Sequence, residues 1–517
     1  MFTTVKNMFV KENSVKGASI ILIITLALSN ILGVFRDHFL AQKIPTDQLD
    51  TYFAAFRLPD LVFNILILSA IAAAFVPVYS NYLREKGFKQ ALRLSQASMT
   101  VGVVTVSVCL VILYFLMPYL MHLLVPSFDE VKRQQTVSLA RWLLISPFFF
   151  TISYFLGGIL NSHKRFLTYS IAPLIYNLSI IAGVLLFAEK YSVMGVVVGV
   201  VFGSFLHMLI QLITALRLGF YPRFIFDVKE AGVRRIFRLM LPRAIGLGAN
   251  QILLVAFTVF ASAFSGGIAI YTFADNIQTV PSVIFGTSFA TAVFPTLAGL
   301  SIAKKADAEQ FEAFFAKSAR AILFFVIPST AIVFVLRAQI IRLILGYGFF
   351  GWSDTKIATA TLGFFALSII AQGLIPLLAK SFYAMHNTKT PMTTTIISIV
   401  VSIILGYFFS RSASLQGVPG LALAFSIGSW LNLGALWMLL DRKISIDYGK
   451  LAFFTLKVIV LTFATAFLMQ IAKVGFGSMF DIDRVKFLAL QTVLVLLVGG
   501  VVYLGGAWLL RIKEIRA

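Results

Sequence analysis

Charged side chains are scarce in this sequence. Only 12% of its 517 residues are charged and 59% are hydrophobic, whereas soluble domains carry about 25% charged and about 45–50% apolar residues. The 21 acidic and 43 basic residues are too few to coat the roughly two to four domains that a soluble protein of this length would form. A cytosolic enzyme is therefore excluded, and the composition indicates a polytopic membrane protein.

Residues that build disulfides, metal sites and catalytic sites are also rare. The single cysteine, Cys109, lies inside an apolar run, which excludes a disulfide framework and a thiol metal site. Five scattered histidines give no metal-ligand spacing. The sequence has no glycine-rich phosphate loop, no paired metal ligands and no nucleophile elbow. We therefore expect no enzymatic activity, no cofactor and no metal.

Basic residues are the one abundant charged class, and they give a net charge of +22. In a soluble protein this excess would indicate nucleic-acid binding. Here the bases lie in short segments between apolar runs, where they set the topology and meet anionic lipid headgroups. Membrane lipids are therefore the expected partners, and no nucleic acid is expected.

The apolar runs predict an all-α protein. A spanning helix needs about 20 mostly apolar residues, and the sequence contains about 14 such runs. The first could pass as a signal peptide, but the others make cleavage unnecessary for export, so we expect it to be retained. The predicted spans cover residues 17–35, 49–79, 95–124, 137–161, 167–187, 193–216, 236–264, 267–300, 313–336, 355–384, 391–409, 417–440, 450–471 and 487–510.

The loop charges predict sidedness. With a cytoplasmic N-terminus, basic residues in the inside segments outnumber those outside by about two to one, as the positive-inside rule requires. The densest inside segment is 217–243. Because the number of spans is even, both termini are predicted to be cytoplasmic.

Short segments recur at an offset of roughly 220 residues, which indicates an internal repeat. Each match is weak alone, but three occur in the same order; the alternative is that apolar helices resemble one another by composition. The matched pairs are 51–57 with 270–276, 74–77 with 292–295, and 162–164 with 385–387.

Six spans per repeat would make the two halves parallel, as in transporters that rock two bundles about a central site. The repeat therefore favours a transporter with two six-helix lobes and two extra helices at the C-terminus. The expected organisation is an N-terminal lobe at residues 1–216, a cytoplasmic linker at 217–235, a C-terminal lobe at 236–440 and two appended helices at 441–517.

Ionisable residues interrupt the predicted spans at two places in the first half. The first span ends in Arg36 and Asp37, and the second carries Arg57 and Asp60 on either side of Pro59. An ionisable group inside a membrane is costly and usually faces a cavity. The proline removes a backbone donor and kinks the helix, which is tolerated where the helix lines a cavity. These residues are therefore candidates for a substrate site.

The eighth span repeats this pattern, because Asp275 again precedes a proline, Pro281. Arginine binds phosphate bidentately and keeps its charge, so Arg36 and Arg57 would suit a phosphate-bearing substrate while the acids position them. The alternative is that Arg36 and Asp37 form an interfacial pair and Arg57 extends its charged end toward the membrane surface.

Three of these stretches, 31–37, 54–60 and 74–77, carry a family likeness. With them the chain resembles the MurJ (MviN) lipid II flippases of the multidrug/oligosaccharidyl-lipid/polysaccharide exporter superfamily. The resemblance implies a V-shaped pair of lobes with a central cationic cavity, and a groove for a lipid tail beside the last two helices. It also implies movement of an undecaprenyl-diphosphate-linked peptidoglycan precursor from the inner to the outer leaflet, with arginines holding the diphosphate.

The chain departs from the family pattern at three cation positions. Asn30, the pair Phe63 and Asn64, and Asn276 stand where the family has arginines. Either the remaining arginines suffice, or the substrate is altered, or flipping is lost. The candidate substrate-binding residues are Arg36, Asp37, Arg57, Asp60, Asp275, Asn30 and Asn276.

The predicted function is a flippase for a polyprenyl-diphosphate-linked saccharide, with lipid II as the first choice. The alternatives are an exporter of another lipid-linked oligosaccharide, a cation-coupled drug exporter of the same superfamily, and a non-transporting scaffold that binds cell-wall synthesis proteins.

Overall fold

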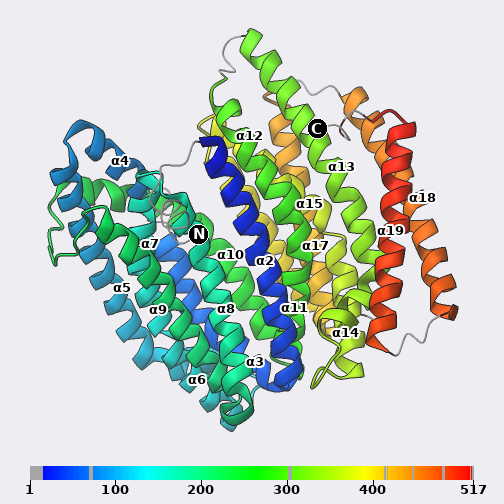
Figure 1. Cartoon of the computed structure of the whole chain (residues 1–517), viewed down its shortest axis with the longest axis horizontal. Coiled ribbons are helices and arrows are strands. Elements are labelled where there is room, and N and C mark those ends of the chain that lie inside the picture. The colour runs from blue at the N-terminus through cyan, green and yellow to red at the C-terminus, as the bar shows by residue number, and fades with distance from the viewer. Residues whose placement is uncertain are drawn as a thin grey trace, which may run out of the picture. The chain divides into compact units, whose positions relative to one another are not determined.

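The computed structural model describes residues 15–68, 74–300, 305–412, 415, 417–444, 448–479, 484–512 and 514 (Figure 1). Every regular element within these residues is a helix, so the predicted all-α fold is confirmed. The chain divides into two compact units, Met1–Ala269 and Ile270–Ala517. The lobe boundaries proposed from the repeat remain a prediction.

The first unit contains nine α-helices and a π-helical segment among its described residues. They are α2 (Val15–Lys43), α3 (Thr46–Val62), η1 (Phe63–Leu68), α4 (Val76–Glu85), α5 (Phe88–Leu124), α6 (Glu130–Leu143), α7 (Ile145–Ser162), α8 (Phe166–Tyr191), α9 (Val193–Arg217) and α10 (Ala231–Ala261).

The division at residues 269 and 270 falls inside α11, and the later elements belong to the second unit. They are α11 (Gly267–Pro281), η3 (Ser282–Thr287), α12 (Ser288–Ala298), α13 (Lys305–Ile344), α14 (Trp352–Ala366), α15 (Ile369–Ala384), α16 (Lys389–Arg411), α17 (Val418–Asp441), α18 (Tyr448–Met479) and α19 (Val485–Leu509).

Eleven helices in the described residues are long and apolar enough to cross a membrane, or twelve if α14 and α15, which meet at a 42° bend, form one span. Two of the fourteen expected spans, 17–35 and 236–264, are not among these twelve candidates. They fall in α2 and α10. Both of these helices include side chains outside the described residues. The count of fourteen therefore remains a prediction.

Both helices that carry the predicted proline breaks change their winding at that point. In α3, Pro59 is followed by the π-helical segment η1, and in α11, Pro281 is followed by the π-helical segment η3. Proline cannot donate the backbone hydrogen bond of an α-helix, and single π-helical turns are frequent at functional sites. The helix before each of the segments η1 and η3 thus ends at or shortly after a proline.

Small residues let several helices approach closely. A side chain at Gly183 of α8 would lie 2.7 Å from the Cα of Gly199 in α9, and a side chain at Gly428 of α17 would clash with Ser402 of α16. Helices in lipid lack a hydrophobic driving force for association, so close backbone packing stabilises them instead.

The last two helices pack against α13 of the second unit (Figure 1). Leu336 of α13, Met469 of α18 and Val495 of α19 form one buried cluster. The Tyr503 hydroxyl donates to the carbonyl of Phe324 at 2.6 Å. The appended helices are therefore an integral part of this unit.

Candidate substrate-binding site

The Arg36–Asp37 pair lies in the C-terminal part of α2. The Arg36 guanidinium donates to Asp37 Oδ1 from both Nε, at 3.0 Å, and Nη2, at 2.8 Å. Asp37 is only 3% exposed, and a buried carboxylate needs a cationic partner. Arg36 therefore compensates the charge of Asp37 in this state.

Arg57 and Asp60 lie one turn apart on α3, directly before η1. The Nε of Arg57 donates to the hydroxyl oxygen of Thr258 on α10 at 2.9 Å. The Asp60 carboxylate interacts electrostatically with the guanidinium groups of both Arg57 and Arg36. The first unit thus brings Arg36, Asp37, Arg57 and Asp60 into one group, which we call the arginine cluster.

Two tyrosines complete the arginine cluster, and sequence reasoning missed both. The hydroxyls of Tyr52 on α3 and Tyr176 on α8 interact electrostatically with Arg36 and Asp60. Tyr52 lies in the repeated segment 51–57, which was the one available signal. Nothing in the sequence marked Tyr176 or Thr258.

The second unit holds Asp275 and Asn276 on α11, both half-buried. Asp275 Oδ1 accepts a hydrogen bond from Gln278 Nε2 at 2.9 Å, and Gln278 Oε1 accepts one from the hydroxyl of Ser368 at 3.2 Å. Asp275 is therefore held by a polar chain within its own unit.

The second unit also holds a cation, Lys380, that sequence reasoning did not single out. Lys380 of α15 donates to the hydroxyl of Thr291 on α12 at 2.5 Å and lies 6.0 Å from the ring centre of Phe294. Phe294 belongs to the repeated segment 292–295. Lys380 thus places a positive charge at the repeat motif of the second unit.

The neutral positions have different surroundings. Asn30 is half-buried on α2. Asn64, inside η1, donates from Nδ2 to the carbonyl oxygen of Asp60 at 2.8 Å. The same carbonyl also accepts from the backbone amide of Phe63, so the asparagine adds a second hydrogen bond at the helix break.

A second buried charge cluster joins the start of α3 to α6 and to the first turn of α11. Asp50 is fully buried, and its carboxylate accepts from the backbone amides of Gly266 at 2.8 Å and Ala269 at 2.9 Å. Lys132 of α6 lies 2.6 Å from Asp47 and 3.5 Å from Asp50. We call this group the Asp50 cluster, and no sequence pattern predicted it.

Chemically, the arginine cluster is suited to binding an anion. It holds two cations and two carboxylates in a half-buried setting beside a helix break. Among the described residues, no group of three His, Cys, Asp or Glu side chains is placed to hold a metal ion. The arrangement fits reversible exchange of a carboxylate for a phosphate on arginine.

A family comparison decides the assignment of the chain. The family model described as lipid II flippase MurJ matches residues 46–491, which is most of the chain. The chain belongs to the MurJ lipid II flippase family. This confirms the likeness carried by the sequence motifs.

Curated relatives agree with that assignment. The chain is 26% identical over 501 residues to a probable lipid II flippase MurJ of Rickettsia prowazekii, covering 96% of this chain and 97% of the relative. It is 24% identical over 426 residues to the lipid II flippase MurJ of Burkholderia cenocepacia, covering 80% and 82%.

Solved structures show the same fold. A lipid II flippase MurJ in an inward closed conformation matches with a TM-score of 0.80 at 23% identity, covering 96% of this chain and 100% of that one. An inward-facing multidrug resistance MATE transporter of the MOP superfamily matches with a TM-score of 0.66 at 14% identity, covering 81% and 98%. This MurJ family member therefore shares its fold with these two solved structures.

Proposed function

We propose that this protein moves lipid II from the inner to the outer leaflet of a bacterial cytoplasmic membrane by alternating access. Membership of the MurJ family supports the substrate, and the likeness to MATE transporters supports the mechanism. The protein makes and breaks no covalent bond in this proposal. It contributes binding and a change of conformation.

The observation that carries the proposal is the arginine cluster. Lipid II presents a diphosphate, and a guanidinium binds phosphate oxygens in pairs. In the structure, Asp37 accepts both hydrogen bonds of Arg36, and the Asp60 carboxylate interacts electrostatically with the guanidinium groups of Arg57 and Arg36. An incoming diphosphate would displace these carboxylates from the arginines, and its release would let the pairs form again. The acids thereby keep the site neutral between turnovers.

Complementation of a bacterium depleted of its lipid II flippase tests the proposal. Expression of this chain should restore growth and cell shape. Failure to rescue despite correct membrane insertion would favour another lipid-linked saccharide, a drug substrate or a scaffold for cell-wall synthesis proteins. Rescue would show that the remaining arginines suffice although Asn30, Asn64 and Asn276 are neutral.

We also propose that both termini are cytoplasmic. In a Cys109→Ser background, Lys86→Cys should resist an impermeant thiol reagent added to intact cells, whereas Gln135→Cys should react. Both positions are exposed, and the predicted topology places them on opposite sides of the membrane. Labelling of position 86 in intact cells, or protection of position 135, would reverse the assigned orientation.

The hydrocarbon tail of the substrate has a candidate site in the second unit. A cavity of about 190 Å³ lies between α13, α18 and α19, beside η3, and is lined by Phe325, Ile332, Thr465, Gly500 and Leu504 among others. We propose that part of the polyprenyl chain lies here while the head group is transported. Its mainly apolar walls suit an isoprenoid.

Gly500→Phe should impair transport of long-chain lipid II more than that of a short-chain analogue. A Cβ atom at Gly500 meets no atom within 4 Å, and Gly500 lines the cavity, so a phenylalanine here adds its ring at the cavity wall. Gly505→Phe on the same helix is the matched control, because it also has open space but lies outside the cavity. Equal transport of both chain lengths by the Gly500 variant would remove the tail site.

A further inference from the structure

A second cavity, in the first unit, is lined by none of the residues of the arginine cluster. It is a groove of about 1140 Å³ between α5 and the helix pair α6–α7, and every lining residue belongs to these helices or to Leu144 between α6 and α7. We call it the α5–α6 groove. Its volume exceeds the roughly 300–1,000 Å³ of ordinary small-molecule pockets.

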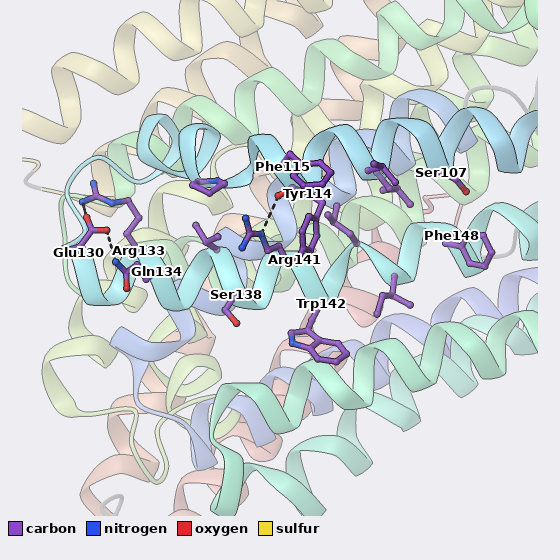
Figure 2. Close-up of a pocket in the computed structure, with 16 residues that line it drawn as sticks. Ser107, Tyr114, Phe115, Glu130, Arg133, Gln134, Ser138, Arg141, Trp142 and Phe148 are labelled. Carbon is purple, nitrogen blue, oxygen red and sulfur yellow. Dashed lines mark hydrogen bonds and ion pairs between the residues drawn. The ribbon is translucent and has the colours of Figure 1, made fainter.

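The side chains that line the α5–α6 groove change from charged and polar at one end to mainly apolar at the other. Figure 2 shows Glu130 and Arg133 at one end, Ser107 and Phe148 at the other, and Arg141 between them. The end that contains Phe148 is mainly apolar, and its side chains include Leu110, Val111 and Ile145. Such a groove matches an amphipathic occupant that has a polar head and a long apolar chain.

The walls of the groove face the surroundings of the helices. Val111 is 57% exposed, Phe115 is 68% exposed and Trp142 is 54% exposed. Both walls belong to helices that are long and apolar enough to cross a membrane. Lipid is therefore the medium that these side chains meet, and lipid molecules have direct access to the groove.

Arg141 supplies the charge that selects among lipids. Its Nε donates to the carbonyl oxygen of Tyr114 at 3.2 Å, and its guanidinium carbon lies 4.5 Å from the centre of the Tyr114 ring. These two contacts hold the side chain in place from α5. They leave the two Nη groups to bind a further acceptor, and a guanidinium presents such groups in a fork that matches phosphate.

The other charges of the groove compensate one another. Arg133 pairs with Glu130 at 2.5 Å and contacts His122 Nδ1 at 2.8 Å. Glu130 also accepts from Gln134, and it is the one acid among the described residues that line the groove. The net positive charge of the groove therefore comes from Arg141.

The depth of Arg141 makes an anionic partner favourable. It lies eleven residues after Glu130, about 16 Å along the helix at ~1.5 Å per residue. A guanidinium at that depth in a lipid-facing wall is costly unless it reaches the interface or binds an anion. A phospholipid phosphate drawn into the groove would provide that anion.

We propose that the α5–α6 groove binds one anionic phospholipid, with its phosphate on Arg141 and one acyl chain along the apolar wall. The bound lipid would fill the space between α5 and α6 and neutralise the guanidinium. In the topology proposed above, this lipid belongs to the outer leaflet. The proposal concerns a site separate from the arginine cluster and does not depend on lipid II transport.

Native mass spectrometry of the purified full-length protein tests this proposal. The protein is equilibrated with equal amounts of phosphatidylglycerol and phosphatidylethanolamine that carry the same acyl chains. We expect roughly tenfold preferential retention of one phosphatidylglycerol, because charge-assisted hydrogen bonds from arginine add to the apolar contacts. Arg141→Gln should bring this preference close to parity.

Arg411→Gln is the matched control. Like Arg141, Arg411 packs on an aromatic ring. Its guanidinium carbon lies 3.8 Å from the ring centre of Tyr407 on the same helix, and it lies outside the groove. This variant should retain the wild-type preference. If Arg141→Gln does not fold, Val111→Trp, which retains both Arg141 and Tyr114, adds bulk to the apolar wall of the groove and should lower retention of the single tightly bound lipid.

Three results would overturn the proposal. Equal retention of the two lipids by the wild type would show that only tails occupy the groove. Loss of the preference in Arg411→Gln would show a general charge effect. Displacement of the bound phosphatidylglycerol by a polyprenyl diphosphate in the wild type, but not in Arg141→Gln, would assign the groove to the transport substrate.

Discussion

Arg36→Ala should weaken the binding of a polyprenyl diphosphate to the purified protein by roughly tenfold to a hundredfold. Hydrogen bonds to charged groups contribute about 1.5–3 kcal/mol each, and Arg36 has both Nε and Nη2 directed at an anionic oxygen, Oδ1 of Asp37. Arg36→Lys should recover only part of the affinity, because an ammonium keeps the charge but lacks the planar fork. Isothermal titration of the detergent-solubilised protein measures the effect.

A double variant separates binding from folding in this experiment. Removing Arg36 alone takes away the ion-pair partner of Asp37, which is 3% exposed, and could destabilise the helix packing. Arg36→Gln combined with Asp37→Asn removes both charges at nearly constant volume. It should fold and still bind the diphosphate weakly.

Arg84→Ala serves as the control for loss of a positive charge. The Arg84 side chain is 77% exposed, and its ion pair is with the adjacent Glu85 at 3.7 Å. Binding should be unchanged in this variant. Wild-type affinity in the Arg36 and Asp37 double variant would show that Arg36 and Asp37 form an interfacial pair without a role in substrate binding.

Asp50→Ala should lower the free energy of unfolding by about 3–5 kcal/mol, the range found when one partner of a buried ion pair is removed. The substitution leaves the amides of Gly266 and Ala269 without their acceptor and takes one carboxylate from Lys132. The expected result is a large fall in the midpoint of thermal unfolding, measured in detergent by the fluorescence of a thiol dye or of tryptophan.

Asp47→Ala is the matched control for Asp50. Asp47 pairs with the same lysine at 2.6 Å, but its side chain is 53% exposed. Surface ion pairs contribute at most about 1 kcal/mol, so this variant should unfold close to the wild type. Similar losses in the two variants would show that Lys132 pairing, and not the buried contacts of Asp50 with backbone amides, stabilises the cluster.

The features that the sequence predicted best are those set by local chemistry. Apolar runs predict spans because an unpaired backbone is too costly in lipid, and the all-helical fold follows from them. The prolines at 59 and 281 predict helix breaks because a proline lacks the amide hydrogen, and η1 and η3 follow them. Both interpretations of Arg36 and Asp37 place the two side chains in contact, because they are adjacent and opposite in charge, and they form an ion pair.

The features that the sequence did not predict depend on contacts between distant segments. Thr258 binds Arg57 across 201 positions in the chain, and Asp50 binds Ala269 across 219. A single threonine, or a single aspartate near the start of a helix, has no sequence pattern that identifies the residue it contacts in the folded chain. Tyr176 and Lys380 likewise became candidates only through the groups that they meet in the folded chain.

Transfer of lipid II across reconstituted vesicles tests the central claim most directly. The purified protein is placed in liposomes that carry fluorescent lipid II in both leaflets, and a membrane-impermeant reductant reports the fraction that reaches the outer leaflet. We predict that the wild type makes nearly all of the lipid II accessible, whereas the Arg36→Gln, Asp37→Asn double variant protects the inner half and the Arg84→Ala variant behaves as the wild type. Protection of the inner half by the wild-type protein, folded and inserted, would contradict the account.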